Sequence, residues 1–497
     1  MNQRAKMKSI SKFTFTVACL LYILCVPTVQ AKKPRPFQCT KTKSESRKNM
    51  QAPSSIPPCT HEPITYEDEM ETMTSTMTSK TDSVTTVNSA TEKTVQFVFT
   101  ILPVKCRDTV TTKIFVATRY PDENASVEIF SPTFETPRIS VFLRKGNGHF
   151  LEIPSHILLK PTDIGQKVNK TLVIASDKLI VAYGHQHCTS VSNWRATAFR
   201  VRPLSELGND YWVLTYQSEG VSQVTIVAAE DNTLLNISMP SQLETLFLDL
   251  DKHESYVFGG EYDVSGSHIV TDKPVLTMAG NSADKIPRGN VGLDPFVECL
   301  SDVTKWGRHF SVVSLMNTSS NYILKIVAAE NETTIRWTDG HNVTQIILGM
   351  GKFYEHEVIL HRNSILEVHS SDPILVAQFS NGLTSSDADE SMVLVPPLSH
   401  GIEPKVITFP VFSLPPDGEN VDSFLTVWVS SDGHYGNLTI DDQQVVWREI
   451  GKDSNDSTIA QTYLSVGSHT LSLVGNVSIR AIVSSYHPWI SYSYPLT

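Results

Sequence analysis

Short runs of alternating apolar and polar residues fill the chain from Val95 to its end, and Gly, Pro, Asn and Asp separate them. Such runs are typical of half-buried β-strands joined by turns. No convincing amphipathic helix pattern interrupts them. The pattern therefore predicts an all-β protein.

One stretch of this pattern occurs twice, one hundred residues apart. Residues 224–237 read VTIVAAEDNTLLNI and residues 324–337 read LKIVAAENETTIRW, with six of fourteen positions identical. Each copy is an alternating run, a two-residue polar break and a second alternating run. This is the pattern of two antiparallel strands joined by a tight turn.

A second stretch of sequence recurs, and its spacing indicates the length and the boundaries of a longer repeat. It begins at Thr171, Ser267 and Ser364, with a weaker copy at Ser468, and the first three copies contain an Asp at matching places. Each copy predicts a strand, a polar Asp-containing turn and a second strand. The matching aspartates are Asp177, Asp272 and Asp372.

Together the two phrases predict four antiparallel modules of about 90–100 residues, the size of a seven-strand β-sandwich. The boundaries fall at 95–205, 206–305, 306–404 and 405–497. A β-propeller is the alternative, although its blades typically need only about 40–50 residues. Strands of the third module are predicted at 310–315, 322–329, 333–338, 344–348, 353–360, 364–369 and 374–379.

The first 94 residues differ in composition from this region. Residues 1–31 combine a basic start, an apolar run from Phe13 to Val26 and small residues up to Ala31, which predicts a cleaved secretory signal. Residues 32–94 are rich in Ser, Thr and scattered Pro and predict a disordered stalk. No later stretch is long and apolar enough to span a membrane. We therefore expect a secreted, extracellular protein.

The charge and the cysteine content restrict the kinds of partner and the disulfides that we expect. The chain has 41 Lys plus Arg and 52 Asp plus Glu, and the signal removes four of the basic residues, which argues against a nucleic-acid partner. The five cysteines left suggest two disulfides and one spare thiol. The shortest loops pair Cys39 with Cys59 and Cys106 with Cys188. Cys299 is then either buried or available to link two chains into a homodimer.

Nine Asn-x-Ser/Thr sequons lie beyond the stalk and predict a glycoprotein. Asn331, at the tip of a predicted hairpin, is well placed to carry a glycan. The nine are Asn124, Asn169, Asn236, Asn317, Asn331, Asn342, Asn437, Asn455 and Asn476.

Catalytic and metal motifs find little support. His185 and His187 could share a strand face, but no third metal ligand can be assigned. The acidic loop 387–390 lacks the glycine and spacing of an EF-hand and reads as a solvated loop. No nucleophile elbow or phosphate-binding glycine loop is present. We expect no cofactor, no metal and no enzymatic activity.

Several phrases, in the same order, resemble the IgGFc-binding protein N-terminal domain family. They are LGNDYWVL from Leu207, the two IVAAE hairpins, SGSHIVTDKPVLTMAGN from Ser265, KWGRHFSVV from Lys305 and DESMVLVPP from Asp389. The resemblance covers about 95–407. It implies an extracellular, mucus-associated binding protein and, through the family's name, an immunoglobulin partner.

Three functional hypotheses follow. The first is a glycosylated binding or adhesion protein that recognises extracellular proteins or glycans, in mucus or innate defence. The second is a matrix or mucus component cross-linked by a disulfide through Cys299. The third is a secreted hydrolase whose catalytic residues are scattered through the chain.

Overall fold

The computed structural model describes residues 93–496 with internal gaps, and all of them belong to one compact unit, Thr86–Thr497. The predicted signal and stalk lie outside the described residues. The fold is all-β, as predicted, and the helices described are five single 3-10 turns. The gaps are 134–137, 190–193, 241, 289–291, 317–319, 339–342, 381–389, 400, 402–405, 415–420, 432, 474–476 and 488–489.

The strands fall into four groups along the chain, which we call modules 1 to 4. Module 1 comprises β1 (Thr94–Phe99), β2 (Thr109–Thr118), β3 (Ala125–Phe130), β4 (Ile139–Leu143), β5 (Gly148–Ile153), η1 (Ser155–Ile157), η2 (Pro161–Asp163), β6 (Gln166–Val168), β7 (Leu172–Ser176), β8 (Ile180–Thr189) and β9 (Arg195–Val201). Module 2 follows η3 (Leu204–Glu206) and comprises β10 (Gly208–Trp212), β11 (Ser222–Ala228), β12 (Thr233–Met239), β13 (Glu244–Leu250), β14 (Ser255–Gly260), β15 (His268–Asp284) and β16 (Asp294–Cys299).

Modules 3 and 4 continue the same order of strands. Module 3 follows η4 (Val303–Lys305) and comprises β17 (Gly307–Val313), β18 (Ser320–Ala328), β19 (Thr333–Thr338), β20 (Val343–Leu348), β21 (Phe353–Leu360), β22 (Ile365–Ser380) and β23 (Ser391–Leu394). Module 4 comprises β24 (Val406–Val411), β25 (Asp422–Val429), η5 (Tyr435–Asn437), β26 (Leu438–Ile440), β27 (Gln443–Gln444), β28 (Arg448–Lys452), β29 (Thr458–Leu464), β30 (Gly467–Leu473), β31 (Ile479–His487) and β32 (Ile490–Pro495).

Each module has an outer and an inner layer of antiparallel strands. In module 1 the outer order is β1-β7-β3-β4 and the inner order is β5-β2-β8-β9, and module 4 repeats this with β24-β30-β26-β27 and β28-β29-β25-β31-β32. In modules 2 and 3 the two layers are joined, because β15 and β22 run through both. This corrects the two predicted hairpins, since β11 and β12 do not pair with each other but with β15, and β18 and β19 pair with β22. The recurring Asp-containing phrase is the segment that passes from the outer to the inner layer.

This passage corrects the predicted turn at Asp272 and Asp372. In module 1 the strand does break after Ser176, but β15 and β22 are continuous. Their pairing with β10 and β17 shifts register at this point, which marks a bulge. A bulge accommodates Pro274 and Pro373, which cannot donate a ladder hydrogen bond. The two strands predicted at 364–379 are therefore one, and the seventh strand of module 3 is β23.

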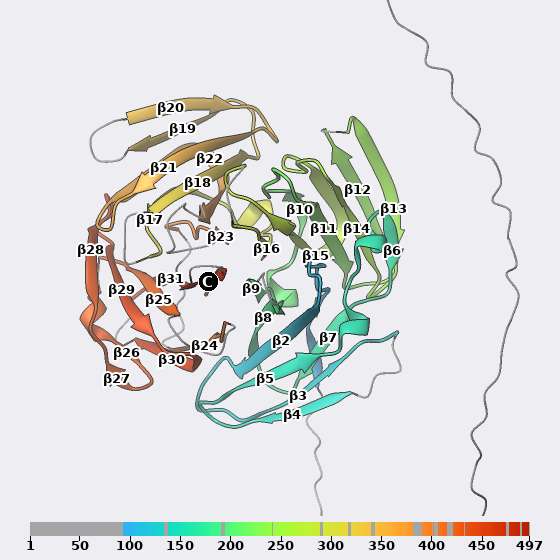
Figure 1. Cartoon of the computed structure of the whole chain (residues 1–497), viewed down its shortest axis with the longest axis horizontal. Helices are drawn as coiled ribbons and strands as arrows, with labels where there is room; N and C mark the ends of the chain where they lie inside the picture. Colours follow the sequence, from blue (N-terminus) through green and yellow to red (C-terminus); the bar gives the residue numbers. More distant parts are fainter. Residues whose placement is uncertain are drawn as a thin grey trace, which may run out of the picture. The chain divides into compact units, whose positions relative to one another are not determined.

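The modules are arranged around a common axis like the four blades of a propeller (Figure 1). The last strand of each module lies at the centre, where β9, β16, β23 and β32 contact one another in that order and β32 closes the ring against β9. Polar groups link these strands. Asp294 Oδ1 accepts from the Ala196 backbone N–H at 3.2 Å and its Oδ2 from Ser491 at 3.0 Å. A carboxylate of module 2 thus joins modules 1 and 4.

Inner strands are buried on both faces because each module packs against its neighbours. In β18, Ile326 belongs to the core of module 3, whereas the next residue, Val327, belongs to a cluster shared with module 2. In β11, the adjacent residues Ile226 and Val227 likewise lie on opposite faces and belong to two different clusters. This explains the near-continuous apolar IVAA runs, since a strand covered on both faces does not alternate. The core is therefore one ring of shared clusters.

Candidate functional site

A pocket of about 670 Å³ lies at one end of the axis, where each module's central strand leads into the next segment of chain. Its lining includes Arg200 of β9, Glu206 of η3, Lys305 of η4 and Ile407 of β24. Leu496, just after β32, completes it. Modules 1, 3 and 4 and the connections on both sides of module 2 thus contribute to this cavity, which we call the axial pocket.

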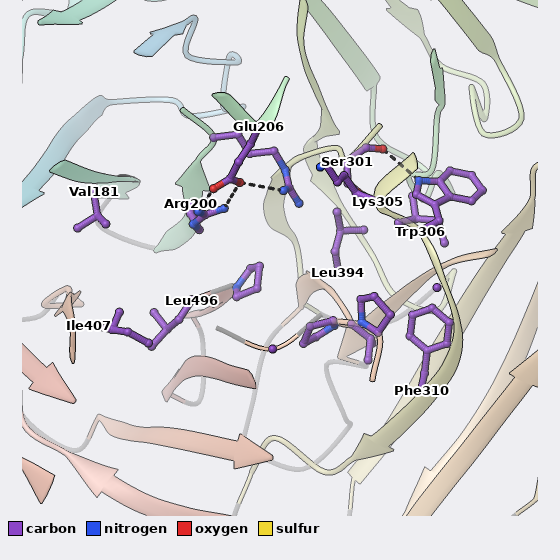
Figure 2. A pocket seen from close by; sticks show the side chains of 18 of the residues that line it. Val181, Arg200, Glu206, Ser301, Lys305, Trp306, Phe310, Leu394, Ile407 and Leu496 are labelled. Atoms are coloured by element: carbon purple, nitrogen blue, oxygen red, sulfur yellow. Dashed lines mark hydrogen bonds and ion pairs between the residues drawn. The ribbon is translucent and has the colours of Figure 1, made fainter. Parts of the chain in front are cut away.

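One wall of the axial pocket is an ion-pair cluster (Figure 2). The Arg200 guanidinium donates from Nη1 to Glu206 Oε2 at 2.8 Å and from Nη2 to Oε1 at 2.7 Å. Arg202 adds a contact from Nη1 to Glu206 Oε2 at 3.3 Å, and its Nε donates to the Cys299 carbonyl at 3.1 Å. The side chains of Arg200 and Arg202 are only 13% and 15% exposed.

Local structure fixes this cluster. Arg200 and Arg202 lie two residues apart at the end of a strand, so their side chains leave the backbone on the same side. Burial alone would raise the pKa of Glu206, but Arg200, followed by the charges of Arg202 and Arg119, lowers it to about 2. The carboxylate is therefore ionised, and the bidentate pairing holds the Arg200 fork in one orientation.

Two further cations lie on the pocket lining. Arg119 follows β2, and Lys305 ends η4, whose N-cap residue Asp302 accepts from Thr304. Asp302 Oδ2 also accepts from the backbone N–H groups of Asn209 and Asp210, at 2.8 and 2.9 Å. These bonds hold the connection between modules 2 and 3 in place. Lys305 is therefore an exposed side chain on a fixed backbone.

The remaining walls are mostly apolar. Phe310 and Trp306 lie on one side, and Ile407 and Leu496 lie across from the Arg200 cluster (Figure 2). The indole Nε1 of Trp306 donates to the Ser301 carbonyl at 3.1 Å, so the ring is held in position. Pockets of this kind, apolar with a few convergent polar groups, are typical of ligand sites.

The described sequon asparagines are distributed away from this pocket. Five are exposed in turns or connections, and Asn236 is half-buried within β12. In Asn124 and Asn331 the side-chain Oδ1 accepts from the backbone of Lys145 and Met350, at 2.9 and 3.0 Å. The five exposed ones are Asn124, Asn169, Asn331, Asn437 and Asn455, whereas Asn317, Asn342 and Asn476 lie outside the described residues.

The cysteine prediction is confirmed for Cys106 and Cys188, which form a disulfide between the segment preceding β2 and the end of β8. Cys39 and Cys59 lie outside the described residues. Cys299 is a free thiol buried in β16, and burial raises its pKa to about 12. This burial keeps the thiol away from the surface on which an intermolecular disulfide would form, which favours the alternative of a buried cysteine.

His185 and His187 share a strand face, as their spacing predicts, and their ring centroids lie 5.3 Å apart. That face is internal, and His185 stacks on Phe412 of module 4 at 4.6 Å. The interpretation of 387–390 as a solvated loop is wrong for Glu390, which is fully buried and accepts from the Ile286 backbone N–H at 3.3 Å, and residues 387–389 lie outside the described residues. Within the part of the chain that the structure describes, no group of three or more His, Cys, Asp or Glu could hold a metal ion.

Sequence reasoning missed the axial pocket. Its basic residues are separated by up to 186 positions, from Arg119 to Lys305, and only the closed ring brings them together. The local signal was the Arg-Val-Arg sequence at 200–202, followed by Glu206 four residues later. Charges at alternate positions of a strand end, with an acidic residue next to them, indicate a shared ionic face.

Comparison with known proteins gives one family. The model of the family described as IgGFc binding protein matches residues 197–483. No curated protein matches the sequence. One solved structure, a "tetra-tandem repeat in extending region of large adhesion protein", is 11% identical, with 76% of this chain and 92% of that chain covered, and its TM-score of 0.09 carries no conclusion. None of the described helices is long and apolar enough to cross a membrane.

Proposed function

Because the chain belongs to the IgGFc binding protein family, we propose that it is a secreted, glycosylated binding or adhesion protein. Its partners would be extracellular proteins or glycans, with an immunoglobulin-like partner among them because of the family's name. The setting would be mucus or innate defence. The Cys106–Cys188 disulfide agrees with an oxidising compartment.

The observation that carries this proposal is the axial pocket. It gathers side chains from modules 1, 3 and 4 and from the connections that flank module 2, all held on a ring of packed β-strands, so its geometry is pre-organised for binding. Arg200 and Glu206 form a bidentate ion pair with each other, so this wall of the pocket is held in one geometry before a partner binds. The matrix alternative requires Cys299 to reach another chain, and the burial of that thiol counts against it.

Affinity capture from extracellular fluid with the recombinant secreted chain tests this function. We expect reproducible enrichment of a glycoprotein class, and treatment of the fluid with glycosidases separates glycan from protein recognition. Val181→Trp would place a bulky side chain at the pocket lining and should remove most of the enrichment.

The matched control is Val270→Trp, which makes the same change at a partly exposed position of β15 outside the pocket lining. Thermal unfolding of both variants verifies that they remain folded. Equal capture by the Val181→Trp and Val270→Trp variants would reject the axial pocket as the recognition site. Failure of the unmodified chain to enrich any partner above background would reject the binding function itself.

A further inference from the structure

The charge of the axial pocket is opposite to that of the protein. The whole chain has a formal net charge of −11. Of the charged residues described on the pocket lining, four are cationic (Arg119, Arg200, Arg202 and Lys305) and one, Glu206, is anionic, an excess of three positive charges. A basic cavity in an acidic protein attracts an anion and concentrates the field at one place.

The cations divide into two that are held and two that are open. Arg200 and Arg202 are engaged with Glu206, and their remaining donors keep a fixed direction. The charge of Arg119 helps to lower the pKa of Glu206, but the side chains of Arg119 and Lys305 take part in none of the ion pairs or side-chain hydrogen bonds formed within the described part of the chain. These two side chains are therefore available to a ligand's anionic group.

The rest of the pocket specifies the framework that carries the anion. Ile407, Leu496 and Phe310 offer apolar walls, and Tyr120, 45% exposed, offers an aromatic ring beside Arg119. A ligand with one anionic group and a body that has an apolar face matches these two halves. A pyranose ring is amphipathic: its C–H faces pack on aromatic and aliphatic side chains, and its hydroxyls can bond to polar lining residues such as Ser301 and Thr408.

Size favours an end group over a protein surface. A cavity of about 670 Å³ lies within the range of roughly 300–1,000 Å³ typical of sites for small ligands. A protein partner would instead need a broad interface of about 800 Å² on each side. We infer that the axial pocket binds the terminal acidic sugar of a glycan through its carboxylate, which Arg119 and Lys305 contact while the ring packs on the apolar walls.

This inference rests on the proposed binding function and names its ligand class. The test is direct titration of the secreted chain with sialyllactose, with lactose as the neutral probe and an acidic peptide as the alternative anion. We expect sialyllactose to bind and lactose to bind at least roughly tenfold more weakly, because a charge-assisted contact is lost. Added salt should weaken the binding of sialyllactose.

Two variants locate the site. Lys305→Glu and Arg119→Gln should each weaken sialyllactose binding by roughly tenfold or more. Lys145→Glu is the control for the first, since it makes the same charge change at an exposed position outside the pocket lining, and should leave the affinity unchanged. Both pocket positions are at least partly exposed, so neither change disturbs the core.

The outcomes separate this inference from the function on which it rests. Equal binding of lactose and sialyllactose, unchanged binding in both pocket variants, or binding of the acidic peptide alone would each overturn the acidic-sugar assignment. If the chain still captures a partner from extracellular fluid, the binding function stands without it. Absence of both sialyllactose binding and capture would overturn the two together.

Discussion

Two interfaces between modules differ in how they handle buried polar groups. Between modules 2 and 3, the fully buried Lys325 of β18 places its Nζ 2.5 Å from Asp263 Oδ2 and 2.9 Å from Glu355 Oε1. The same ammonium lies 4.1 Å from the centre of the Phe353 ring. A buried cation is stable only when it is paired in this way.

Between modules 4 and 1, the interface is aromatic, and two of its buried polar side chains, His185 and Tyr183, lack a hydrogen-bond partner among the described residues. His185 stacks on Phe412 and lies 5.5 Å from Tyr492. In His185 both ring nitrogens lack a partner within the described part of the chain, and in Tyr183 it is the hydroxyl. This interface joins the two ends of the ring, which no linker connects directly.

The difference shows two ways to position neighbouring blades. An ion-pair network is directional, so it fixes how module 3 sits on module 2, whereas aromatic packing tolerates small shifts. Closing the ring must also offset the entropy of bringing distant segments together. The closing interface relies on apolar burial for this and carries a titratable group without a partner. We therefore expect the two interfaces to respond differently to charge removal and to acid.

The largest effect should come from removing both carboxylates that pair with Lys325. Asp263→Asn together with Glu355→Gln leaves a buried ammonium without a counter-charge, which costs about 3 kcal/mol in the free energy of unfolding. This is the low end of the range because the two carboxylates are 25% and 40% exposed. Chemical denaturation measures it. Glu357→Gln on the same strand is the control, and equal stability of both would show that the pair does not hold the interface.

The second effect is a dependence on pH. Burial, then the nearby His187 and Lys113, lower the pKa of His185 well below its usual 6.5. The folded protein therefore keeps this ring neutral, while the unfolded chain binds a proton below about pH 6.5. Stability is unaffected above that pH and falls below it, by about 1.4 kcal/mol per pH unit from this group.

His185→Phe isolates this contribution. The variant keeps the stacking on Phe412 and cannot titrate, so its stability should fall less steeply than that of the unmodified protein between pH 6.5 and 5. The other buried or half-buried histidines, such as His187 and His356, have lowered pKa values too, so some slope will remain. If the free energy of unfolding changes equally with pH in both proteins, protonation of His185 does not destabilise the folded state.

The smallest effect compares two tyrosines of the closing interface. The Tyr492 hydroxyl accepts from the Phe412 backbone N–H at 2.8 Å and donates to its carbonyl at 2.9 Å. Tyr492→Phe should cost about 1 kcal/mol, whereas Tyr183→Phe removes a hydroxyl without a described partner and should be neutral or stabilising. Thermal unfolding distinguishes them. A loss of stability in Tyr183→Phe as large as in Tyr492→Phe would contradict this account of the interface.

The sequence predicted the strands well where the local pattern determines them. The bounds expected for 333–338 and 353–360 are those of β19 and β21. The strands of the two repeated stretches are also present, as β11 and β12 and as β18 and β19, but the prediction that they form hairpins is wrong, because each pair is separated in the sheet by β15 or β22. Alternation fails at Asp372 because Pro373 signals a break, although a bulge lets the strand continue. A local sequence pattern cannot show whether the neighbouring strand can pair around a bulge and so let the strand continue through a proline.

The candidate site was beyond the reach of such patterns. Arg119 lies in module 1, Lys305 in the connection between modules 2 and 3, and Leu496 after the last strand of module 4, so their proximity depends on the order of the modules around the axis. That order is set by apolar clusters that two modules share, such as the one that contains Val327 of module 3 and residues of module 2. A strand that contributes to such a cluster is apolar on both faces. An uninterrupted apolar run shows that a strand is covered on both sides, but not which module covers it.

Because modules 1, 3 and 4 and the connections that flank module 2 all supply part of the axial pocket, the pocket exists only while the ring is closed. Its occupancy and closure are then thermodynamically linked, and a ligand that binds only the closed form stabilises it in proportion to the logarithm of its concentration. A chain with one displaced module would lose the ligand as well as the contact. Binding would in this way report on the integrity of the whole ring, and a partner rich in the ligand would favour intact copies over damaged ones.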